Sequence, residues 1–233
     1  MATVDAPAQG ADPTRSVTVR RLAIVGGGEH AAVVLDAARS RPDLWAVVGF
    51  SDRSREARLA GHDPSVADLG TDEDLADRVA REGGATTSLV LGVGGGTSPG
   101  DRATIVARLG NDALWAIVVH AAGIVSPSAT LGEGAVVMAG AIVQAGATIG
   151  RHAIVNSGAV IEHDVVVGDF AHVGPAAAIG GGTRVGQGAF VGLGARVRDH
   201  VVIGDGATIG MGAVVVSDVP AATSVVGVPA RRR

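Results

Sequence analysis

Three consecutive ionisable residues, Glu162, His163 and Asp164, form the segment of this sequence best suited to acid–base chemistry. An imidazole titrates near neutral pH, and a neighbouring carboxylate orients it and raises its basicity. A further histidine, His172, follows nine residues after His163, and Asn156 precedes the triplet. A histidine in a polar turn is ordinarily solvated and inert, but the acid directly beside His163 indicates a residue that accepts a proton from a substrate.

These residues lie in a repeat with a period of six. From Val125 to Val215 every sixth residue is Val, Ile or Leu, at all 16 positions. The next residue is Gly at nine of these sites, and the fourth residue after the aliphatic is Ala at 12. Such a period is typical of a parallel β-helix, in which each hexad forms a short strand and a turn. We predict a left-handed parallel β-helix of hexapeptide repeats over residues 121–233.

The composition agrees with a narrow interior and excludes several function classes. Only five of the 233 residues are aromatic, and a narrow prism would be overfilled by large rings. A formal net charge of −4 argues against a nucleic-acid binder, and the absence of cysteine excludes a disulfide or a Cys nucleophile. No apolar run approaches 18 residues, so we expect no membrane span and a cytoplasmic protein. Residues 1–19 read as a disordered leader.

Residues 20–120 alternate between strand-like and helix-like segments. We expect strands at 21–25, 45–50, 88–93 and 114–120, and helices at 31–40, 71–83 and 101–110. Thr71 with Asp74 provides a helix start signal, and Gly83 a stop signal. This alternation predicts a small parallel, Rossmann-like sheet in an α/β domain.

Two other chemistries fit the residues less well. A dinucleotide-binding turn would need a third glycine where Ala31 stands in GGGEHA. A zinc site on a β-helix needs histidines that stack on one edge, but no two of His152, His163, His172 and His200 are 18 residues apart. We therefore predict no metal.

Three segments together resemble a known family. IEHDVVVGDFAHVGPAA (161–177), IVGGGEHA (24–31) and VVGVPARRR (225–233) resemble the sugar acyltransferases of the sialic-acid O-acetyltransferase type. Within that type, the sequence is most similar to nucleotide-amino-sugar N-acetyltransferases, such as the UDP-4-amino-sugar acetyltransferase of bacillosamine synthesis. The resemblance spans about residues 21–233, with both domains in the same order. It implies N-acetylation of a nucleotide-linked amino sugar by direct transfer from acetyl-CoA.

The resemblance also implies roles for individual residues. His163 corresponds to the general base and Asp164 to the acid that increases its basicity, while His172 would lie at the acetyl-CoA and Asn156 near the base. The N-terminal domain would bind the nucleotide sugar. Its candidate contacts are Gly27, Gly28, Glu29, Ser51, Asp52 and Gly92. Gly-rich turns that enter a helix hold diphosphates, and an acid that ends the second strand binds ribose hydroxyls.

The known members of this fold commonly form trimers, so we expect a homotrimer. The pantetheine arm of coenzyme A would then lie in a groove between two prisms. Small residues would line that groove: Gly180, Gly181, Ala195 and Gly210.

Two alternative functions remain open at this point. The same base would serve O-acetylation of a sugar hydroxyl, and the sequence does not separate the two acceptors. A hexapeptide protein could also bind a nucleotide sugar as a non-catalytic scaffold, although the His163–Asp164 pair argues against it. The nucleotide, the position of the amine and the length of the acyl chain are not determined by the sequence.

Overall fold

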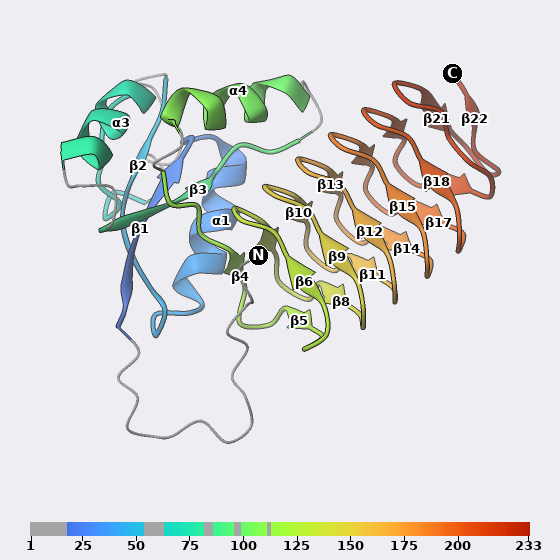
Figure 1. The fold of residues 1–233 in the computed structure, drawn as a ribbon, viewed down its shortest axis with the longest axis horizontal. Helices are drawn as coiled ribbons and strands as arrows, with labels where there is room; N and C mark the ends of the chain where they lie inside the picture. Colours follow the sequence, from blue (N-terminus) through green and yellow to red (C-terminus); the bar gives the residue numbers. More distant parts are fainter. Residues whose placement is uncertain (1–17, 54–62, 82–85, 96–98, 111–112) are drawn as a thin grey trace.

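The computed structural model describes residues 18–53, 63–81, 86–95, 99–110 and 113–233. The expected disordered leader lies almost entirely outside these residues. Figure 1 shows a small α/β unit joined side by side to the first turns of a long prism of short strands. Among the described residues, no helix is long and apolar enough to cross a membrane.

The N-terminal unit is a three-stranded parallel sheet covered by helices on both faces. Its strands β1 (Arg20–Val25), β2 (Trp45–Ser51) and β3 (Thr87–Leu91) have the order β2-β1-β3. Helix α1 (Glu29–Arg39) packs with Leu22 and Ile24 of β1. Helices α3 (Asp72–Arg81) and α4 (Pro99–Leu109) pack on the opposite face. The predicted Rossmann-like domain is thus confirmed in its element order.

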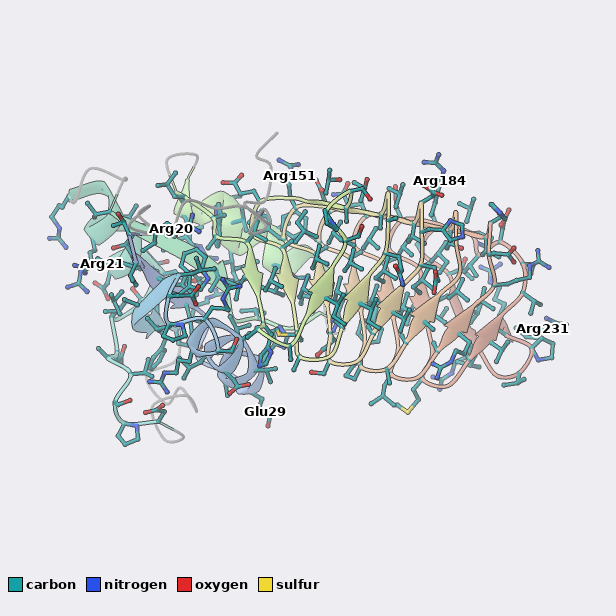
Figure 2. The ribbon with its side chains drawn as sticks, turned by 90° about the horizontal axis from the view of Figure 1, so that it is seen from below. Arg20, Arg21, Glu29, Arg151, Arg184 and Arg231 are labelled. Carbon is teal, nitrogen blue, oxygen red and sulfur yellow. The ribbon has the colours of Figure 1, made fainter. Side chains whose placement is uncertain are left out.

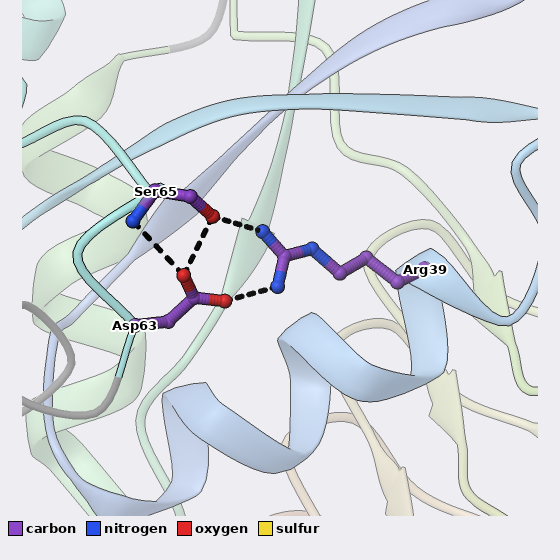
Figure 3. A network of polar contacts seen from close by, with 3 residues as sticks. All are labelled: Arg39, Asp63 and Ser65. Carbon is purple, nitrogen blue, oxygen red and sulfur yellow. Dashed lines mark hydrogen bonds and ion pairs between the residues drawn. The ribbon is translucent and has the colours of Figure 1, made fainter.

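Side-chain hydrogen bonds explain where α3 begins and what holds the end of α1. The Thr71 hydroxyl accepts the Asp74 N–H at 3.2 Å while Asp74 accepts the Thr71 N–H at 2.9 Å, a reciprocal capping box at the start of α3. At the end of α1, Arg39 donates to Asp63 and Ser65, which are themselves hydrogen-bonded (Figure 3). This contact fixes the segment after residue 62 against α1.

The predicted fourth strand of this domain, over 114–120, is wrong as a strand of the N-terminal sheet. Its contact with β3 is one parallel bridge of Trp115 to Leu89, in which the Leu89 N–H donates to the Leu114 carbonyl and the Ala116 N–H donates to the Leu89 carbonyl. The pair Val118–Val119 (β4) instead pairs with Val136–Val137 and begins the stack of the prism. The apolar pattern of this segment fits either sheet, and its buried residues are Ala116 and Val118 in the middle, whereas Leu114 is 46% exposed.

The prism has three faces of stacked strands. Face 1 holds β4 (Val118–Val119), β7 (Val136–Val137), β10 (Ile154–Val155), β13 (His172–Val173), β16 (Phe190–Val191), β19 (Thr208–Ile209), β21 (Ser224–Val226) and β22 (Arg231–Arg232). Face 2 holds β5 (Ile124–Val125), β8 (Ile142–Val143), β11 (Val160–Ile161), β14 (Ala178–Ile179), β17 (Arg196–Val197) and β20 (Val214–Val215). Face 3 holds β6 (Thr130–Leu131), β9 (Thr148–Ile149), β12 (Val166–Val167), β15 (Arg184–Val185) and β18 (Val202–Ile203).

The hexad repeat explains this architecture directly. From β4 to β20 the strands of a face pair in parallel at a spacing of 18 residues, as Val155 does with Val173, so three hexads make one coil. The predicted aliphatics and alanines form one continuous buried column from Leu131 to Val225. Turns need a left-handed backbone at one position, as at Gly146 and Gly182 with φ of 71° and 67°, where glycine has no Cβ to clash. The predicted β-helix is confirmed.

The two units share a core, which fixes their relative position. Val34 and Ala38 of α1 pack in one buried cluster with Val136 and Ile154 on the outer side of face 1. The N-terminal unit therefore covers the first coils of face 1. His172 occupies the next outward position of this face, at the edge of the covered area.

Candidate active site

His163 and Asp164 occupy the corner between faces 2 and 3. Asp164 has a left-handed backbone, with φ of 59°, at a position where most turns carry glycine. This conformation turns its carboxylate back to the neighbouring ring, and Asp164 Oδ2 lies 2.9 Å from His163 Nδ1. Side chains of adjacent strand residues would point to opposite faces, so the contact depends on the corner. A non-glycine residue in this conformation is often found at a functional site.

Glycines in the adjacent coils make room for both side chains. A Cβ on Gly181, 18 residues after His163, would lie 2.6 Å from His163 Nε2. A Cβ on Gly146, 18 residues before Asp164, would lie 2.5 Å from the Asp164 carboxylate. The imidazole therefore lies directly against the Gly181 backbone. Within the described part of the chain, the Gly181 N–H makes no hydrogen bond.

The electrostatics of this pair suit a base. The hydrogen bond to Asp164 is the main cause that raises the pKa of His163 above its ordinary value. The ring is 62% exposed, so a substrate can reach it. With Nδ1–H donated to Asp164, Nε2 carries the free lone pair that can accept a proton.

His172 lies at the seam between the two units. His172 is only 7% exposed, and in the loop after β3 the Gly95 N–H donates to its Nδ1 at 3.0 Å, while the Gly95 carbonyl oxygen lies 3.2 Å from the same atom. Its Nε2 lies 3.1 Å from Asn156 Nδ2. Because Ser157 N–H donates to Asn156 Oδ1 at 2.8 Å, the amide must present its N–H groups to His172. Nδ1 thus faces the N–H and the carbonyl of Gly95, and Nε2 faces the Asn156 amide, so both ring nitrogens have polar neighbours.

Two further basic side chains, His30 and Arg102, lie near His172. The ring of His30, in the first turn of α1, lies 6.1 Å from the ring of His172. Arg102 of α4 is 2% exposed and donates to the carbonyls of Phe170 and His152 on the adjacent coils. Sequence reasoning missed Arg102. Its position three residues before the buried Ile105 and seven before Leu109, on the apolar stripe of α4, was the available signal.

The histidines at the seam between the two units, His30, His152 and His172, are neutral at pH 7. Burial is the main cause that lowers the pKa of His30, His152 and His172 to about 4, and the charge of Arg102 acts in the same direction on all three.

This burial predicts an acid-labile fold. The unfolded chain takes up protons at these histidines below pH 6.5, whereas the folded chain does so only near pH 4. The unfolding free energy should therefore fall as pH drops from 6.5 towards 4, by about 1–3 kcal/mol per histidine. Urea unfolding at pH 7 and pH 5 measures the effect, and His172→Gln should reduce the difference. Equal stability at both pH values would contradict the assignment of neutral, buried rings.

The predicted nucleotide-sugar residues gather at the carboxyl ends of β1 and β2. Asp52, directly after β2, accepts the N–H of Gly27 at 2.5 Å, so the acid and the Gly-rich turn are adjacent. Gly28 precedes α1 and is exposed. The exposed Glu29 projects outward from the start of α1 in Figure 2.

The structure gives two of these candidates a packing role. Ser51 has no exposed surface, and its hydroxyl donates to the buried Asp72 at 3.2 Å. Gly92 is buried where a Cβ would lie 2.7 Å from the Gly26 carbonyl oxygen and 2.8 Å from Ala31. Gly92 therefore allows α1 to approach the sheet closely, and neither residue presents a side chain to a ligand.

The predicted groove residues separate into two groups. Gly181 lies at the corner beside His163. Ala195, in contrast, is fully buried in the core of the prism, so its assignment to the groove lining is wrong. The fourth position of each hexad points inward, as the repeat itself requires. Gly180 and Gly210 are partly exposed and pack against the next coil, at Asp199 and Val226 respectively.

The histidines are distributed over different sides of the prism. His163 and His200 share the corner between faces 2 and 3, separated by Gly181 and Gly182. His172 projects from face 1, which is the face that this corner does not touch. One chain therefore does not bring His163 and His172 to a common substrate. Among the described residues, no three metal-ligating side chains cluster.

Known proteins share this repeat and this fold. The family model described as bacterial transferase hexapeptide (six repeats) matches residues 128–163. PerB from Caulobacter crescentus, solved with CoA and GDP-perosamine, is 35% identical over 94% of this chain and 99% of that chain, with a TM-score of 0.81. The acetyltransferase domain of PglB from Neisseria gonorrhoeae FA1090, solved with acetyl coenzyme A, is 33% identical over 92% and 100%, with a TM-score of 0.81.

More distant similarity extends only to the fold. WeeI from Acinetobacter baumannii AYE is 23% identical over 92% of this chain and 100% of that chain, with a TM-score of 0.67. No curated protein matches the sequence.

The repeat is that of the bacterial hexapeptide transferases. The chain belongs to the family of hexapeptide-repeat sugar N-acetyltransferases that includes PerB and the PglB domain, and it is an acetyltransferase. The family predicted from the three sequence segments is thereby confirmed.

Proposed function

We propose that this protein transfers the acetyl group of acetyl-CoA to the amine of a nucleotide-linked amino sugar, with His163 as general base. The observation that carries the proposal is the exposed His163–Asp164 pair at a coil corner, in a chain that aligns over nearly its full length with PerB. PerB was solved with CoA and GDP-perosamine, and the PglB domain with acetyl coenzyme A. These relatives favour an amine acceptor over the hydroxyl acceptor that the sequence left open.

The geometry of the corner suggests how the chain promotes the reaction. His163 Nε2 accepts the proton that the amine loses as its nitrogen bonds to the thioester carbonyl carbon, and Asp164 stabilises the resulting imidazolium. The unpaired Gly181 N–H is a suitable donor to the thioester oxygen as negative charge develops there. The C–S bond of the thioester then breaks, and coenzyme A leaves as the thiol with the proton that His163 had accepted. No acyl-enzyme is needed.

His172 and Asn156, at the seam between the two units, form part of the proposed site for the acceptor sugar. Both ring nitrogens of His172 are engaged, by Gly95 and Asn156, so we propose that His172 acts by orienting the Asn156 amide. The Asn156 amide then retains one N–H for the substrate. The nearby turn of Gly27 and Asp52 is the proposed site of the diphosphate and ribose.

A second copy of the chain would complete this site. His163 and the His172 seam lie on opposite sides of one prism, so a substrate held at the seam needs a base from a neighbouring chain. The outward column of face 2 is apolar in its first coils, with Ile124 63% exposed, and offers a surface for that neighbour. We propose the homotrimer predicted from the sequence, and a cytoplasmic location where acetyl-CoA is available.

A panel of UDP-, GDP- and dTDP-linked amino sugars tests the function itself. Release of free thiol from acetyl-CoA should require an amino sugar and should not occur with the matching hydroxyl sugar. Thiol release with the hydroxyl sugars alone would favour O-acetylation. Binding of a nucleotide sugar without thiol release across the panel would favour the scaffold.

The nucleotide site makes a separate prediction. Gly27→Val places a side chain in the buried turn beside Asp52, so the KM for the nucleotide sugar should rise by about tenfold or more. The KM for acetyl-CoA should stay within about twofold, since its proposed contacts lie at the distant corner. Initial rates with each substrate varied in turn measure both constants. Equal increases in the two constants would contradict this location.

A further inference from the structure

The charge of Arg102 has an unusual environment for a buried arginine. The side chain is 2% exposed, and no carboxylate that the structure describes lies within ion-pair distance. Its Nη1 donates to the Phe170 carbonyl at 3.0 Å, its Nη2 donates to the His152 carbonyl, and its Nε is buried without a partner. Burial lowers the pKa of Arg102 only to about 10, so it stays charged at neutral pH. Burying an unpaired charge is costly, so its retention calls for a reason beyond packing.

The two carbonyls that Arg102 binds belong to exceptional turns. His152 and Phe170 occupy stacked positions of the corner between faces 3 and 1, with φ of 54° and 59°. The equivalent turns above and below carry Gly134 and Gly188, which adopt this conformation without strain. The two rings stack with centroids 5.0 Å apart, and Trp115 contacts His152 edge-on at 4.8 Å. The backbone is thus strained at the two residues that Arg102 holds.

The N-terminal unit contacts this coil a second time at His172. Phe170 precedes His172 by two positions, and His172 binds Gly95 of the loop after β3. Gly95 lies in the loop after β3, and Arg102 lies in α4, the next helix. The N-terminal unit therefore binds this coil at two points, Phe170 through Arg102 and His172 through Gly95. The orientation of His172, and through it that of Asn156, depends on both contacts.

We propose that Arg102 is a positioning residue for acetyl transfer, which fixes the coil carrying His172 and Asn156 against the nucleotide-sugar domain. This inference rests on the proposed function. Arg102 touches neither substrate; it acts through the carbonyls of His152 and Phe170. Its charge also disfavours protonation of His172, whose other ionisable neighbour is His30 of α1. A neutral ring keeps one nitrogen without a proton, which can accept a hydrogen bond from the Gly95 N–H or from the Asn156 amide.

Two substitutions separate the charge of Arg102 from its two hydrogen bonds. R102M removes both, whereas R102K retains a charge but reaches at most one carbonyl. R108M is the matched control, because Arg108 lies on the same helix, is 29% exposed and pairs with Asp72 rather than with the coils. NMR titration of the full chain measures the pKa of His172, and H172Q identifies its ring signal. Steady-state kinetics measure kcat and KM.

The expected results form a distinct pattern. R102M should raise the pKa of His172 and lower kcat about tenfold or more, with the KM for acetyl-CoA within about twofold. R102K should keep the low pKa and recover part of kcat, and R108M should leave the titration of His172 unchanged. If R102M does not fold, R102K alone must still lower kcat while the pKa of His172 stays low.

Either of two results would overturn the proposal. One is R102M with wild-type kcat and wild-type titration of His172. The other is R102M with reduced kcat but an unaltered titration, which would mean a merely structural role. The titration needs no substrate, so it can be read even if acetyl transfer itself is not observed.

Discussion

Replacing His163 by alanine should lower kcat at pH 7 by about 10²-fold or more, the range expected for loss of a general base. The imidazole is an exposed corner group whose only described side-chain hydrogen bond is to Asp164, so the β-helix should retain its melting temperature. Binding of acetyl-CoA should persist, because no role in holding it is assigned to this ring. Rates from thiol release and affinity from calorimetry measure the two effects. Near-full activity from pH 6 to 9 would contradict the assignment of the base.

Asp164→Asn is the matched control for this substitution. The carboxylate raises the pKa of His163, so its removal should lower that pKa. The base is active in its neutral form, and the acidic limb of the kcat/KM profile should therefore move to lower pH. The loss of rate should be smaller than for His163→Ala, since the imidazole remains. A limb that moves to higher pH would show that another group titrates.

Mixing two inactive variants should restore activity if neighbouring chains share the site. His163→Ala removes the base and His172→Gln disturbs the seam, and each alone should be about 10²-fold less active. In each trimer that contains both variants, about a third of the sites would combine an intact His163 from one chain with an intact His172 from its neighbour. Co-expression of the two variants with different tags, followed by tandem purification, gives the mixed oligomers.

Two outcomes would contradict the shared site. Mixed oligomers as inactive as the parent variants would mean that each chain builds its own site. A monomeric mass by light scattering would exclude the proposed trimer, for which chains of 23.0 kDa give about 69 kDa.

The β-helix could be predicted because its cause is local. An aliphatic every six residues and alanine four residues later specify the same inward positions in every coil, and the structure buries them from Leu131 to Val225. The capping pair of Thr71 and Asp74 likewise depends on residues three apart. His163 and Asp164 are adjacent in sequence, so their contact needed only a corner, and the repeat predicted one.

Long-range relations could not be predicted in this way. The repeat does not indicate that Arg102 reaches carbonyls 50 and 68 residues away, nor that Gly95 binds His172. Ala195 was assigned to a groove for its small size, but its place in the hexad directs it into the core. Residues 114–120 are apolar enough for either sheet, and the packing of α1 on face 1 decides between them.

The proposed acceptor is an amine, and the bond formed in the product distinguishes an amine from a hydroxyl acceptor. The protein is incubated with acetyl-CoA and a nucleotide-linked amino sugar labelled with ¹⁵N at the amine, and the product is analysed by NMR. We expect an amide N–H coupled to the ¹⁵N label, in amounts equal to the coenzyme A released, and greatly reduced product with His163→Ala. An acetyl ester on a sugar hydroxyl, with the labelled amine unchanged, would contradict the proposal.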